Sequence, residues 1–179
     1  MYVAPVDVNA ALSSSLVLVE HLLARTKIRV ERELKATLQA PINRQELQQV
    51  LINLMINAIQ AMPDGGTLTL RTANQTDAQG RPGVVTEVCD TGNGLTEAVR
   101  ERLFSPFFST KNDGNGLGLW ISQGLVERYG GGLSGANRSD GTSGAVFTVR
   151  LLTEPQAPAA VSTQDGRPGW LPQPGERPA

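Results

Sequence analysis

Residues 44–62 read RQELQQVLINLMINAIQAM and carry the strongest structural pattern in this chain of 179 residues. Asn43 is a good N-cap residue, and Glu46 follows three residues later, as in a capping box. The apolar residues recur at i, i+3, i+4 and i+7, the spacing of an amphipathic helix with a wide buried stripe. They are Leu47, Val50, Leu51, Leu54, Met55, Ala58 and Ile59. The pattern therefore predicts a long helix that is buried along one side.

Two asparagines interrupt the apolar character of this helix. Asn53 and Asn57 are four residues apart, so their side chains lie on one side of the helix, one turn from each other. A buried amide that lacks a hydrogen-bond partner costs on the order of 1–3 kcal/mol. The pair therefore indicates either a polar cavity at the edge of the core or two side chains that bond neighbouring loops.

The segments on either side of this helix predict a mixture of helices and strands. Upstream, Asn9 is expected to cap a helix that runs to about Thr26, and Ile28, Val30 and Leu34 then indicate a strand. Downstream, the expected elements are a turn at 63–66, strands at 67–73 and 84–90, a helix from 117 to about 129, and a final strand at 145–152. This order lacks strict βαβ alternation. It predicts an α+β fold, an α/β sandwich with one mixed sheet and helices packed on one face.

Composition excludes several classes of protein. The chain weighs 19.1 kDa and has a net charge of −1, which argues against binding driven by a broad basic surface, as in non-specific binding of nucleic acid or anionic membranes. The single Cys89 excludes an internal disulfide, and the single His21 excludes a multi-histidine metal site. No apolar run is long enough to span a membrane, and the first residues do not read as a secretory signal.

The end of the chain differs from the rest in composition. Residues 154–179 hold six of the eleven prolines, and proline cannot donate a backbone hydrogen bond, so regular structure is not expected there. The sequence thus predicts a folded domain over residues 1–153 and a disordered, Pro-rich tail over residues 154–179.

Two glycine motifs lie in the second half of the predicted domain. Asp90 ends a predicted strand and is followed by Gly92 and Gly94, an arrangement that also occurs in plain turns and calcium loops. Residues 114–119 (GNGLGL) lead directly into a predicted helix, where free backbone amides and the helix dipole favour an anion. This second motif is neither a Walker A loop nor a dinucleotide fingerprint, because the residues that define those motifs are absent.

Taken together and in order, these motifs resemble the catalytic ATP-binding domain of two-component sensor histidine kinases, within the GHKL family of Bergerat fold that includes gyrase, heat-shock chaperone and mismatch-repair ATPases. The resemblance runs from about Pro5 to Leu152. It rests on five motifs: QQVLINLMINAIQAM looks like the N box, DTGNGL the G1 box, FSPFFSTK the F box, GNGLGL the G2 box and GTSGAVF the G3 box.

The resemblance implies roles for residues of the N and G1 boxes. Asp90 would accept the amino group of adenine, while Gly92, Gly94 and Leu95 would shape the wall beside the base. Asn57 would be the ligand of Mg²⁺, and Asn53 would support the metal and phosphate region; both count as catalytic in this reading.

The resemblance also assigns the residues between the F box and the following helix. The nearest cation to the glycine loop, Lys111, would bind the phosphates of ATP and take part in catalysis. The hinge of a lid and a phosphate cradle would come from Gly114, Gly116, Leu117, Gly118 and Leu119. The F-box phenylalanines would pack against this lid.

The chain departs from the family pattern at several positions. Gln60 stands where many histidine kinases have Lys or Arg, and Ala145 stands where many have Thr or Ser. The lid between Lys111 and Gly114 is short. His21 lacks the neighbours expected of a phosphoacceptor histidine, so that histidine is expected on another domain or chain.

The resemblance therefore implies a protein-histidine kinase domain that binds ATP and Mg²⁺ and transfers the γ-phosphate to a histidine of a dimerisation and phosphoacceptor domain. A response regulator would follow in the pathway, and the domain would be cytoplasmic, monomeric in isolation, and without contact to nucleic acid or membrane. An amide at Asn53, where ATPase relatives place a glutamate base, disfavours efficient ATP hydrolysis. Two alternatives stay open: an anti-sigma-type serine kinase, and a nucleotide-dependent interaction module without transfer activity.

Overall fold

The computed structural model describes residues 3–109 and 117–154, which form a mixed sheet with a layer of helices. The sheet has five strands in the order β2-β4-β5-β7-β6. Strand β2 is parallel to β4, and the other neighbours are antiparallel. The bounds of the strands are Ile28–Leu34 for β2, Gly66–Thr76 for β4, Pro82–Cys89 for β5, Gly132–Asn137 for β6 and Ala145–Leu152 for β7.

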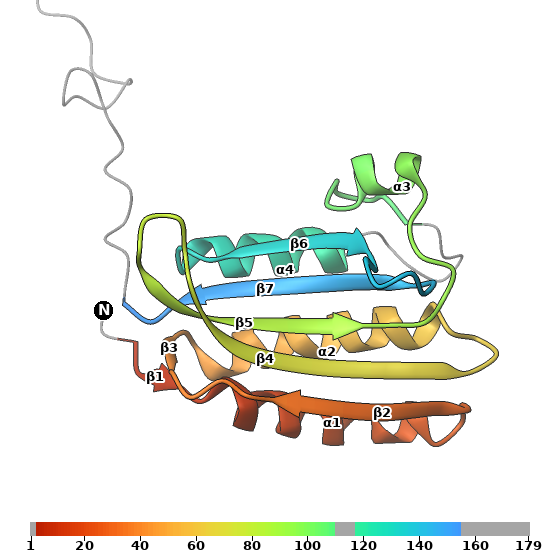
Figure 1. Ribbon diagram of the computed structural model, residues 1–179, viewed down its shortest axis with the longest axis horizontal. Helices are drawn as coiled ribbons and strands as arrows, with labels where there is room; N and C mark the ends of the chain where they lie inside the picture. Colours follow the sequence, from red (N-terminus) through yellow and green to blue (C-terminus); the bar gives the residue numbers. More distant parts are fainter. Residues whose placement is uncertain (1–2, 110–116, 155–179) are drawn as a thin grey trace, which may run out of the picture.

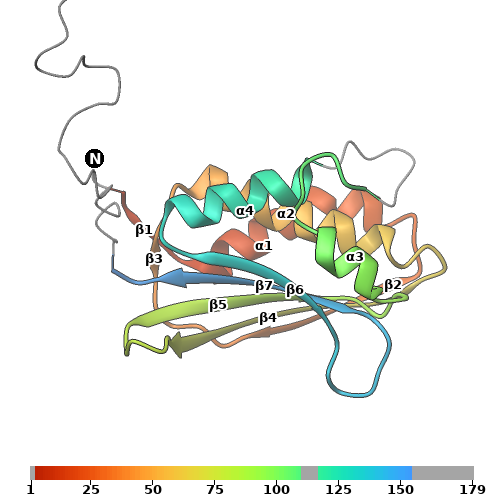
Figure 2. The same ribbon diagram turned by 90° about the horizontal axis from the view of Figure 1, so that it is seen from above.

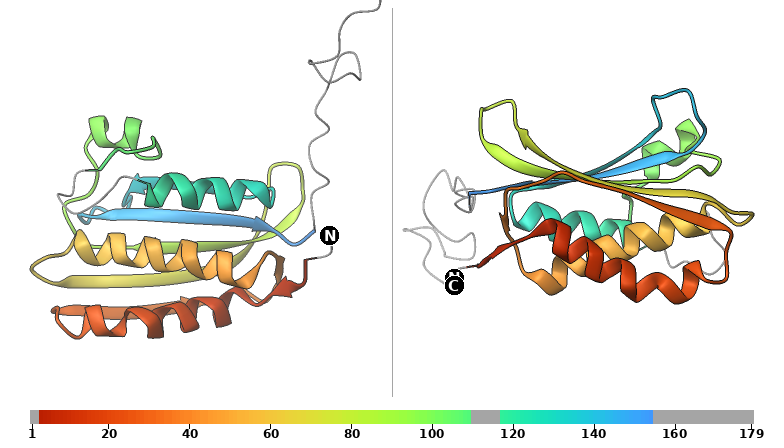
Figure 3. Two further views of the ribbon diagram at one scale, coloured as in Figure 1. Left: turned by 180° about the vertical axis from the view of Figure 1, so that it is seen from behind. Right: turned by 60° about the horizontal axis from the view of Figure 1, so that its bottom comes forward.

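The three long helices of the described chain all cover the same face of this sheet (Figure 2). They are α1 (Val8–Leu23), α2 (Arg44–Gln60) and α4 (Gly118–Arg128), with α2 between the other two (Figure 3). The short helix α3 (Glu97–Arg102) stands beyond the end of the sheet at which β5 ends (Figure 1). Strands β1 (Pro5–Val6) and β3 (Ala40–Pro41) form a separate antiparallel pair. The predicted mixed sheet with helices on one face is confirmed.

The core lies between the helices and the inner face of the sheet. All seven apolar residues predicted for the buried stripe of α2 are buried. They face alternate residues of the central strands, among them Leu68 and Leu70 of β4 and Phe147 and Val149 of β7. Because alternate side chains of a strand point to opposite faces, one face of each strand is apolar and the other carries charges such as those of Arg71 and Glu87.

The beginning of α1 differs from the prediction. The N-cap residue is Asp7 rather than Asn9, because the Asp7 carboxylate accepts a hydrogen bond from the Ala10 amide. Asn9 lies inside the first turn, where its side chain donates to the Ala36 carbonyl (2.9 Å) and accepts from the Thr72 hydroxyl (2.5 Å). The asparagine therefore links α1 to the sheet instead of capping the helix, and the helix ends at Leu23 rather than near residue 26.

The predicted cap of α2 is confirmed only in part. Asn43 is the N-cap residue, and its side chain accepts from the Glu46 amide (3.1 Å). The Glu46 carboxylate does not complete the capping box. Instead it accepts hydrogen bonds from Arg128 and Tyr129 at the C-terminal end of α4. The predicted second helix is confirmed as α4, which begins at Gly118 and ends at Arg128.

Four elements of the structure, β1, β3, β6 and α3, are absent from the prediction. Strands β1 and β3 have only two residues each, too few to show an alternating pattern. Strand β6 has the sequence GLSGAN, whose glycines hide the alternation typical of a strand. Helix α3 has six residues and none of them is buried, so it lacks the apolar stripe by which a helix is found. No helix in the described ranges is long and apolar enough to cross a membrane.

Candidate functional site

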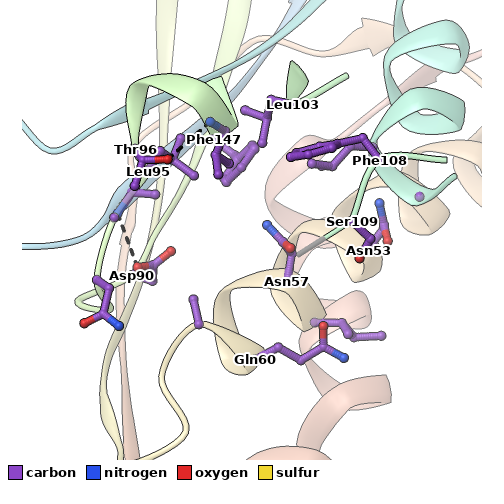
Figure 4. A pocket seen from close by; sticks show the side chains of 18 of the residues that line it. Asn53, Asn57, Gln60, Asp90, Leu95, Thr96, Leu103, Phe108, Ser109 and Phe147 are labelled. Atoms are coloured by element: carbon purple, nitrogen blue, oxygen red, sulfur yellow. Dashed lines mark hydrogen bonds between the residues drawn. The ribbon is translucent and has the colours of Figure 1, made fainter. Parts of the chain in front are cut away.

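A cleft of about 600 Å³ opens between the C-terminal half of α2 and the loop after β5. The segments that line it, the C-terminal half of α2 and the loop after β5, lie at the opposite end of the molecule from β1 and the end of β7 (Figure 1). The polar residues that line it are Asn53, Asn57, Gln60, Asp90, Asn93, Thr96 and Ser109. Its apolar walls include Ile56, Leu95, Val99, Leu103, Phe108, Leu119, Ala145 and Phe147. Figure 4 shows Asp90 and Leu95 on one side of the cleft and the α2 residues on the other.

Asp90 is the acidic residue of this cleft among the described residues, and it is only 2 % exposed. Its Oδ1 atom accepts hydrogen bonds from the backbone amides of Gly92 (2.9 Å) and Ala145 (3.2 Å). The Asp90 amide in turn donates to the Ala145 carbonyl (3.0 Å). These bonds fix the plane of the carboxylate, which can therefore accept a donor in a defined direction.

The glycines after Asp90 have different reasons to be glycine. A Cβ atom on Gly92 would lie 2.3 Å from the Ala61 carbonyl oxygen, so this residue lets the loop pass directly against the end of α2. Gly94 has a φ of 75°, in the region that favours glycine, and a Cβ there would lie 2.7 Å from Oδ1 of Asn137. Gly94 lines the cleft, whereas Gly92 is not among the lining residues and packs against Ala61 at the end of α2.

Asn53 is held by the beginning of α4. Its Nδ2 atom donates to Oγ of Ser122 (3.1 Å), a residue that is 2 % exposed. A Cβ atom on Gly118 would lie 2.6 Å from Oδ1 of Asn53, so the glycine allows α4 to approach the asparagine closely. The side chain of Asn53 is therefore fixed in position at the rim of the cleft.

The predicted site residues come together only in part, and some lie outside the described residues. Those that line the cleft are Asn53, Asn57, Asp90, Gly94, Leu95, Gly118 and Leu119. Gly92 and Leu117, the N-cap residue of α4, lie next to lining residues without being among them. Lys111, Gly114 and Gly116 lie outside the described residues.

The cleft contains both departures from the family pattern, and one of them, Gln60 in place of Lys or Arg, removes a positive charge. Gln60 and Ala145 both line the cleft, so the substitutions lie at the site itself. Among the described lining residues there is no Lys, Arg or His. The described residues also contain no group of three or more His, Cys, Asp or Glu that could hold a metal ion. A metal here would thus need an amide oxygen together with oxygens of the ligand itself.

Of the F-box phenylalanines, Phe108 is the one that lines the cleft. Its ring lies 4.9 Å from the Arg102 guanidinium, which places a cation over the aromatic face. Phe104 packs partly against the core, whereas Phe107 is 76 % exposed and has a φ of 63°. The predicted packing of the lid by these residues involves positions outside the described ranges.

The residues that hold the loop after β5 in place were not predicted from the sequence. Asn137 at the end of β6 donates to the Leu95 carbonyl (2.8 Å) and accepts from the Leu95 amide (2.6 Å). Arg138 donates to the Asp90 carbonyl (3.3 Å), and Ser143 to the Gly92 carbonyl (2.6 Å). These partners are more than 40 residues apart in sequence, so no local spacing signals them.

Comparison with known proteins identifies the family. Residues 42–155 match the family described as histidine kinase-, DNA gyrase B- and HSP90-like ATPases, and the chain belongs to this family. Among curated relatives, the signal transduction histidine-protein kinase AtoS of Escherichia coli is 35% identical over 153 residues, which cover 84% of this chain. The C4-dicarboxylate transport sensor protein DctB of Rhizobium meliloti is 44% identical over 116 residues, 64% of this chain.

Solved structures give the same result for the fold. The catalytic domain of histidine kinase ThkA superposes with a TM-score of 0.74 at 30% identity, covering 86% of this chain and 97% of that one. The mycobacterial sensor histidine kinase MprB gives a TM-score of 0.73 at 25% identity, covering 86% and 99%. The chain spans 24% of the length of AtoS and 17% of DctB. The resemblance to histidine-kinase catalytic domains, and with it the Bergerat fold, is confirmed.

Proposed function

We propose that this chain is the ATP-binding catalytic domain of a sensor histidine kinase, which transfers the γ-phosphate of ATP to a histidine on a separate dimerisation and phosphoacceptor domain. One observation carries the proposal: a buried carboxylate at Asp90 faces two helix amides, Asn53 and Asn57, across a cleft with apolar walls. Such a cleft suits a ligand with an amine at one end, a flat apolar ring, and oxygen-rich groups at the other end.

The adenine would bind at the Asp90 end of the cleft. The carboxylate, oriented by the Gly92 and Ala145 amides, would accept a hydrogen bond from the exocyclic amine. Gly94 and Leu95 would form part of the wall beside the base, and Phe147 offers an apolar surface close to them. A carboxylate accepts only, so a base with a carbonyl in place of this amine would be rejected.

The phosphates would lie at the α2 end of the cleft, where Asn57 would be the protein ligand of Mg²⁺. The donor set fits this ion, because Mg²⁺ prefers oxygen ligands and is commonly held by few protein groups together with phosphates and waters. When bound, the metal would neutralise charge on the phosphates. Asn53, fixed by Ser122, would support this region, and Gly118, Leu119 and Leu117 would lie at the base of the lid.

Three further roles concern residues outside the described ranges. Lys111 would bind the phosphates, and Gly114 and Gly116 would supply backbone amides to them. A cation at Lys111 would compensate for the uncharged Gln60 in the cleft.

The chain's contribution to the transfer is to hold the nucleotide in line with the incoming imidazole. The step would form a bond from the imidazole nitrogen to the γ-phosphorus and break the bond from that phosphorus to the bridging oxygen, releasing ADP. Asn53 cannot take a proton from water, because an amide is not a base at neutral pH; hydrolysis is thus disfavoured. His21 is exposed on α1 and does not line the cleft, so the acceptor histidine would come from elsewhere.

The partners would be the phosphoacceptor domain and, through it, a response regulator. A related kinase, ThkA, has been solved in complex with the response regulator protein TrrA. We also propose that the domain is cytoplasmic, that it is a monomer in isolation, and that it contacts neither nucleic acid nor membrane.

Titration with a fluorescent ATP analogue, with and without Mg²⁺, tests the proposal. Asp90→Asn is expected to weaken binding by at least about 100-fold. The variant would place the NH2 group of an amide, a hydrogen-bond donor, opposite the adenine amine, which is also a donor. Asn57→Ala is expected to remove the Mg²⁺-dependent part of the affinity. The matched control is Glu20→Gln on the exposed surface of α1, which should bind like the wild type.

Normal binding by Asp90→Asn would overturn the site assignment. A second measurement addresses the transfer itself: the chain is mixed with a separately made phosphoacceptor fragment and γ-labelled ATP. Acid-labile label on the fragment is the expected result. Tight ATP binding without any transferred label would favour the interaction module over the kinase.

A further inference from the structure

The turn that joins β6 to β7 holds the loop that contains Asp90. Three side chains, two of this turn and one at the end of β6, bond backbone atoms of that loop: Arg138 bonds Asp90, Ser143 bonds Gly92, and Asn137 bonds Leu95. Two of these side chains bond residues that follow Asp90 in the loop, whereas Arg138 donates to the carbonyl oxygen of Asp90 itself. Arg138 is therefore the side chain of the turn with the most direct influence on the carboxylate.

The guanidinium of Arg138 is largely buried and has a fixed orientation. Its side chain is 11% exposed, and Nη2 donates to the Asp140 carboxylate at 2.8 Å. Asp140 is in turn held by the amide of Thr142 (3.1 Å) and by its hydroxyl (2.5 Å). The bond to Asp140 raises the pKa of Arg138, and the nearby charge of Asp90 contributes in the same direction. The arginine is thus a permanently charged, pre-oriented donor.

The backbone at Asp90 is held on both sides of its Cα atom and has little room to move. Its amide donates to the Ala145 carbonyl, and its carbonyl accepts from Nη1 of Arg138 at 3.3 Å. A Cβ atom on Gly144 would lie 2.0 Å from the Asp90 carbonyl oxygen, so the turn packs directly against it. A shift of the backbone at Asp90 that displaces its Cα atom would also move the carboxylate, because the side chain is attached to that atom.

We propose that Arg138 is a positioning residue for recognition of the adenine base: locked by Asp140, it holds the Asp90 peptide so that the carboxylate meets the exocyclic amine. This inference rests on the proposed function of the same cleft. Arg138 does not line the cleft and would not touch the nucleotide. Its effect would therefore appear in the preference for adenine rather than in the affinity for phosphates.

Base selectivity tests this role, with ATP and inosine triphosphate as the probes, since inosine has a carbonyl where adenine has the amine. For Arg138→Ala, the Kd for ATP is expected to rise by about tenfold, the worth of one hydrogen bond to a charged group. The Kd for inosine triphosphate should change by less than about twofold on the same reasoning, because that base makes no amine contact. Arg138→Lys should restore part of the preference, as an ammonium can still donate to a carbonyl.

Two further variants separate positioning from stability. Asp140→Asn keeps the arginine but loosens its anchor, so it should lower the ATP preference less than Arg138→Ala does. The matched control is Arg150→Ala, which removes an arginine of β7 that bonds Ser134 and has no bond to the Asp90 loop; its preference should equal the wild type's. Melting temperatures of all variants are measured alongside, and if Arg138→Ala does not fold, Asp140→Asn and Arg138→Lys carry the test.

An unchanged ratio of the two Kd values, with a lowered melting temperature, would show that Arg138 only stabilises the turn and would overturn the inference. The Asp90→Asn variant distinguishes this result from a failure of the proposed function. If Asp90→Asn keeps the wild-type preference, the assignment of the cleft is wrong; if it loses the preference while Arg138→Ala keeps it, only the role of Arg138 is wrong.

Discussion

Gly118 shows how a single missing side chain positions the site. The first residue of α4 lies against α2, where a Cβ atom would come within 2.6 Å of Oδ1 of Asn53. Asn53 itself donates to the buried Ser122 one turn further along α4. The glycine therefore sets the distance between two helices and, through it, the position of an amide at the cleft.

We expect Gly118→Ala to push the Asn53 side chain away from Ser122. The loss of this hydrogen bond should lower the free energy of unfolding by about 1 kcal/mol, and Mg²⁺-dependent nucleotide affinity should fall with it. Urea denaturation and nucleotide titration measure the two effects.

The control lies in the same helix. A Cβ atom on Gly124 would meet nothing within 4 Å, so Gly124→Ala should stabilise the protein by about 0.5–1 kcal/mol through helix propensity alone. Nucleotide affinity should not change. Equal behaviour of the two alanine variants would show that close approach at Gly118 has no consequence.

At the residue scale, the sequence indicated the helix amides but not the residues behind Asp90. Asn53 and Asn57 stand out because they are polar residues in an apolar helix. Arg138 does not stand out, since an arginine after a glycine-rich segment is ordinary in a turn. Its importance comes from a bond to a carbonyl 48 residues away.

At the scale of elements, α2 and α4 are joined at two levels. Near the cleft the connection is Asn53 to Ser122, and at the far end Glu46 of α2 accepts from Arg128 (2.5 Å) and from the Tyr129 hydroxyl. The bond to Tyr129, followed by Arg128, holds the pKa of Glu46 below its ordinary value, although burial opposes this shift. The ionised carboxylate therefore stabilises the pairing of the two helices.

Tyr129→Phe should lower the free energy of unfolding by about 1 kcal/mol at pH 7, because it removes a hydrogen bond to a charged group that is partly exposed. The folded-state pKa of Glu46 is lowered, so this stabilisation is present above the unfolded-state pKa and is lost as the pH falls through the folded-state value. The difference between wild type and variant should thus shrink on acidification below about pH 4.

Chemical denaturation at several pH values measures this difference. Glu46→Gln provides the matched control, since it cannot ionise, and the Tyr129→Phe change made in its background should show no such dependence on pH. A difference between wild type and Tyr129→Phe that stays constant from pH 7 to pH 3 would contradict the assignment of the effect to Glu46.

The elements that the sequence predicted share one property, which is an apolar pattern that the core requires. Helix α2 buries a stripe of apolar residues, and strands β4, β5 and β7 bury apolar residues at alternate positions, such as Leu68 and Leu70 of β4. This spacing is visible in the sequence. Strand β6 contributes one buried residue, Leu133, and its pairing with β7 comes from backbone hydrogen bonds that carry no sequence pattern.

On the scale of the whole molecule, the segments that line the cleft and the ends of the described chain lie at opposite ends of the sheet (Figure 1). Thr153 follows β7 and donates to the Pro82 carbonyl through its amide and its hydroxyl, both at 3.1 Å. This contact ties the residue after β7 to the first residue of β5, at the end of the sheet remote from the cleft. We propose that the folded domain ends here, as the composition of residues 154–179 predicts.

Removal of residues 155–179 should leave the melting temperature within about 1 °C of that of the full chain, below the shift of about 2–4 °C that a loss of about 1 kcal/mol produces in a domain of this size. The ATP affinity should also be unchanged. A shorter variant that ends at Leu152 loses both bonds to Pro82 and should be less stable, which makes it the control. A large drop in melting temperature for the first variant would contradict the domain boundary.

The sequence by itself determined the fold class, the central helix and the order of the glycine motifs, because these depend on periodicity and on backbone chemistry that neighbouring residues express locally. Tertiary structure alone decided that Asn9 bonds the sheet, that Glu46 joins two helices, and that Asn137, Arg138 and Ser143 support the Asp90 loop. The physical reason is that a polar side chain bonds whichever donor or acceptor the packed chain brings near it, and that partner is set by packing rather than by distance along the sequence.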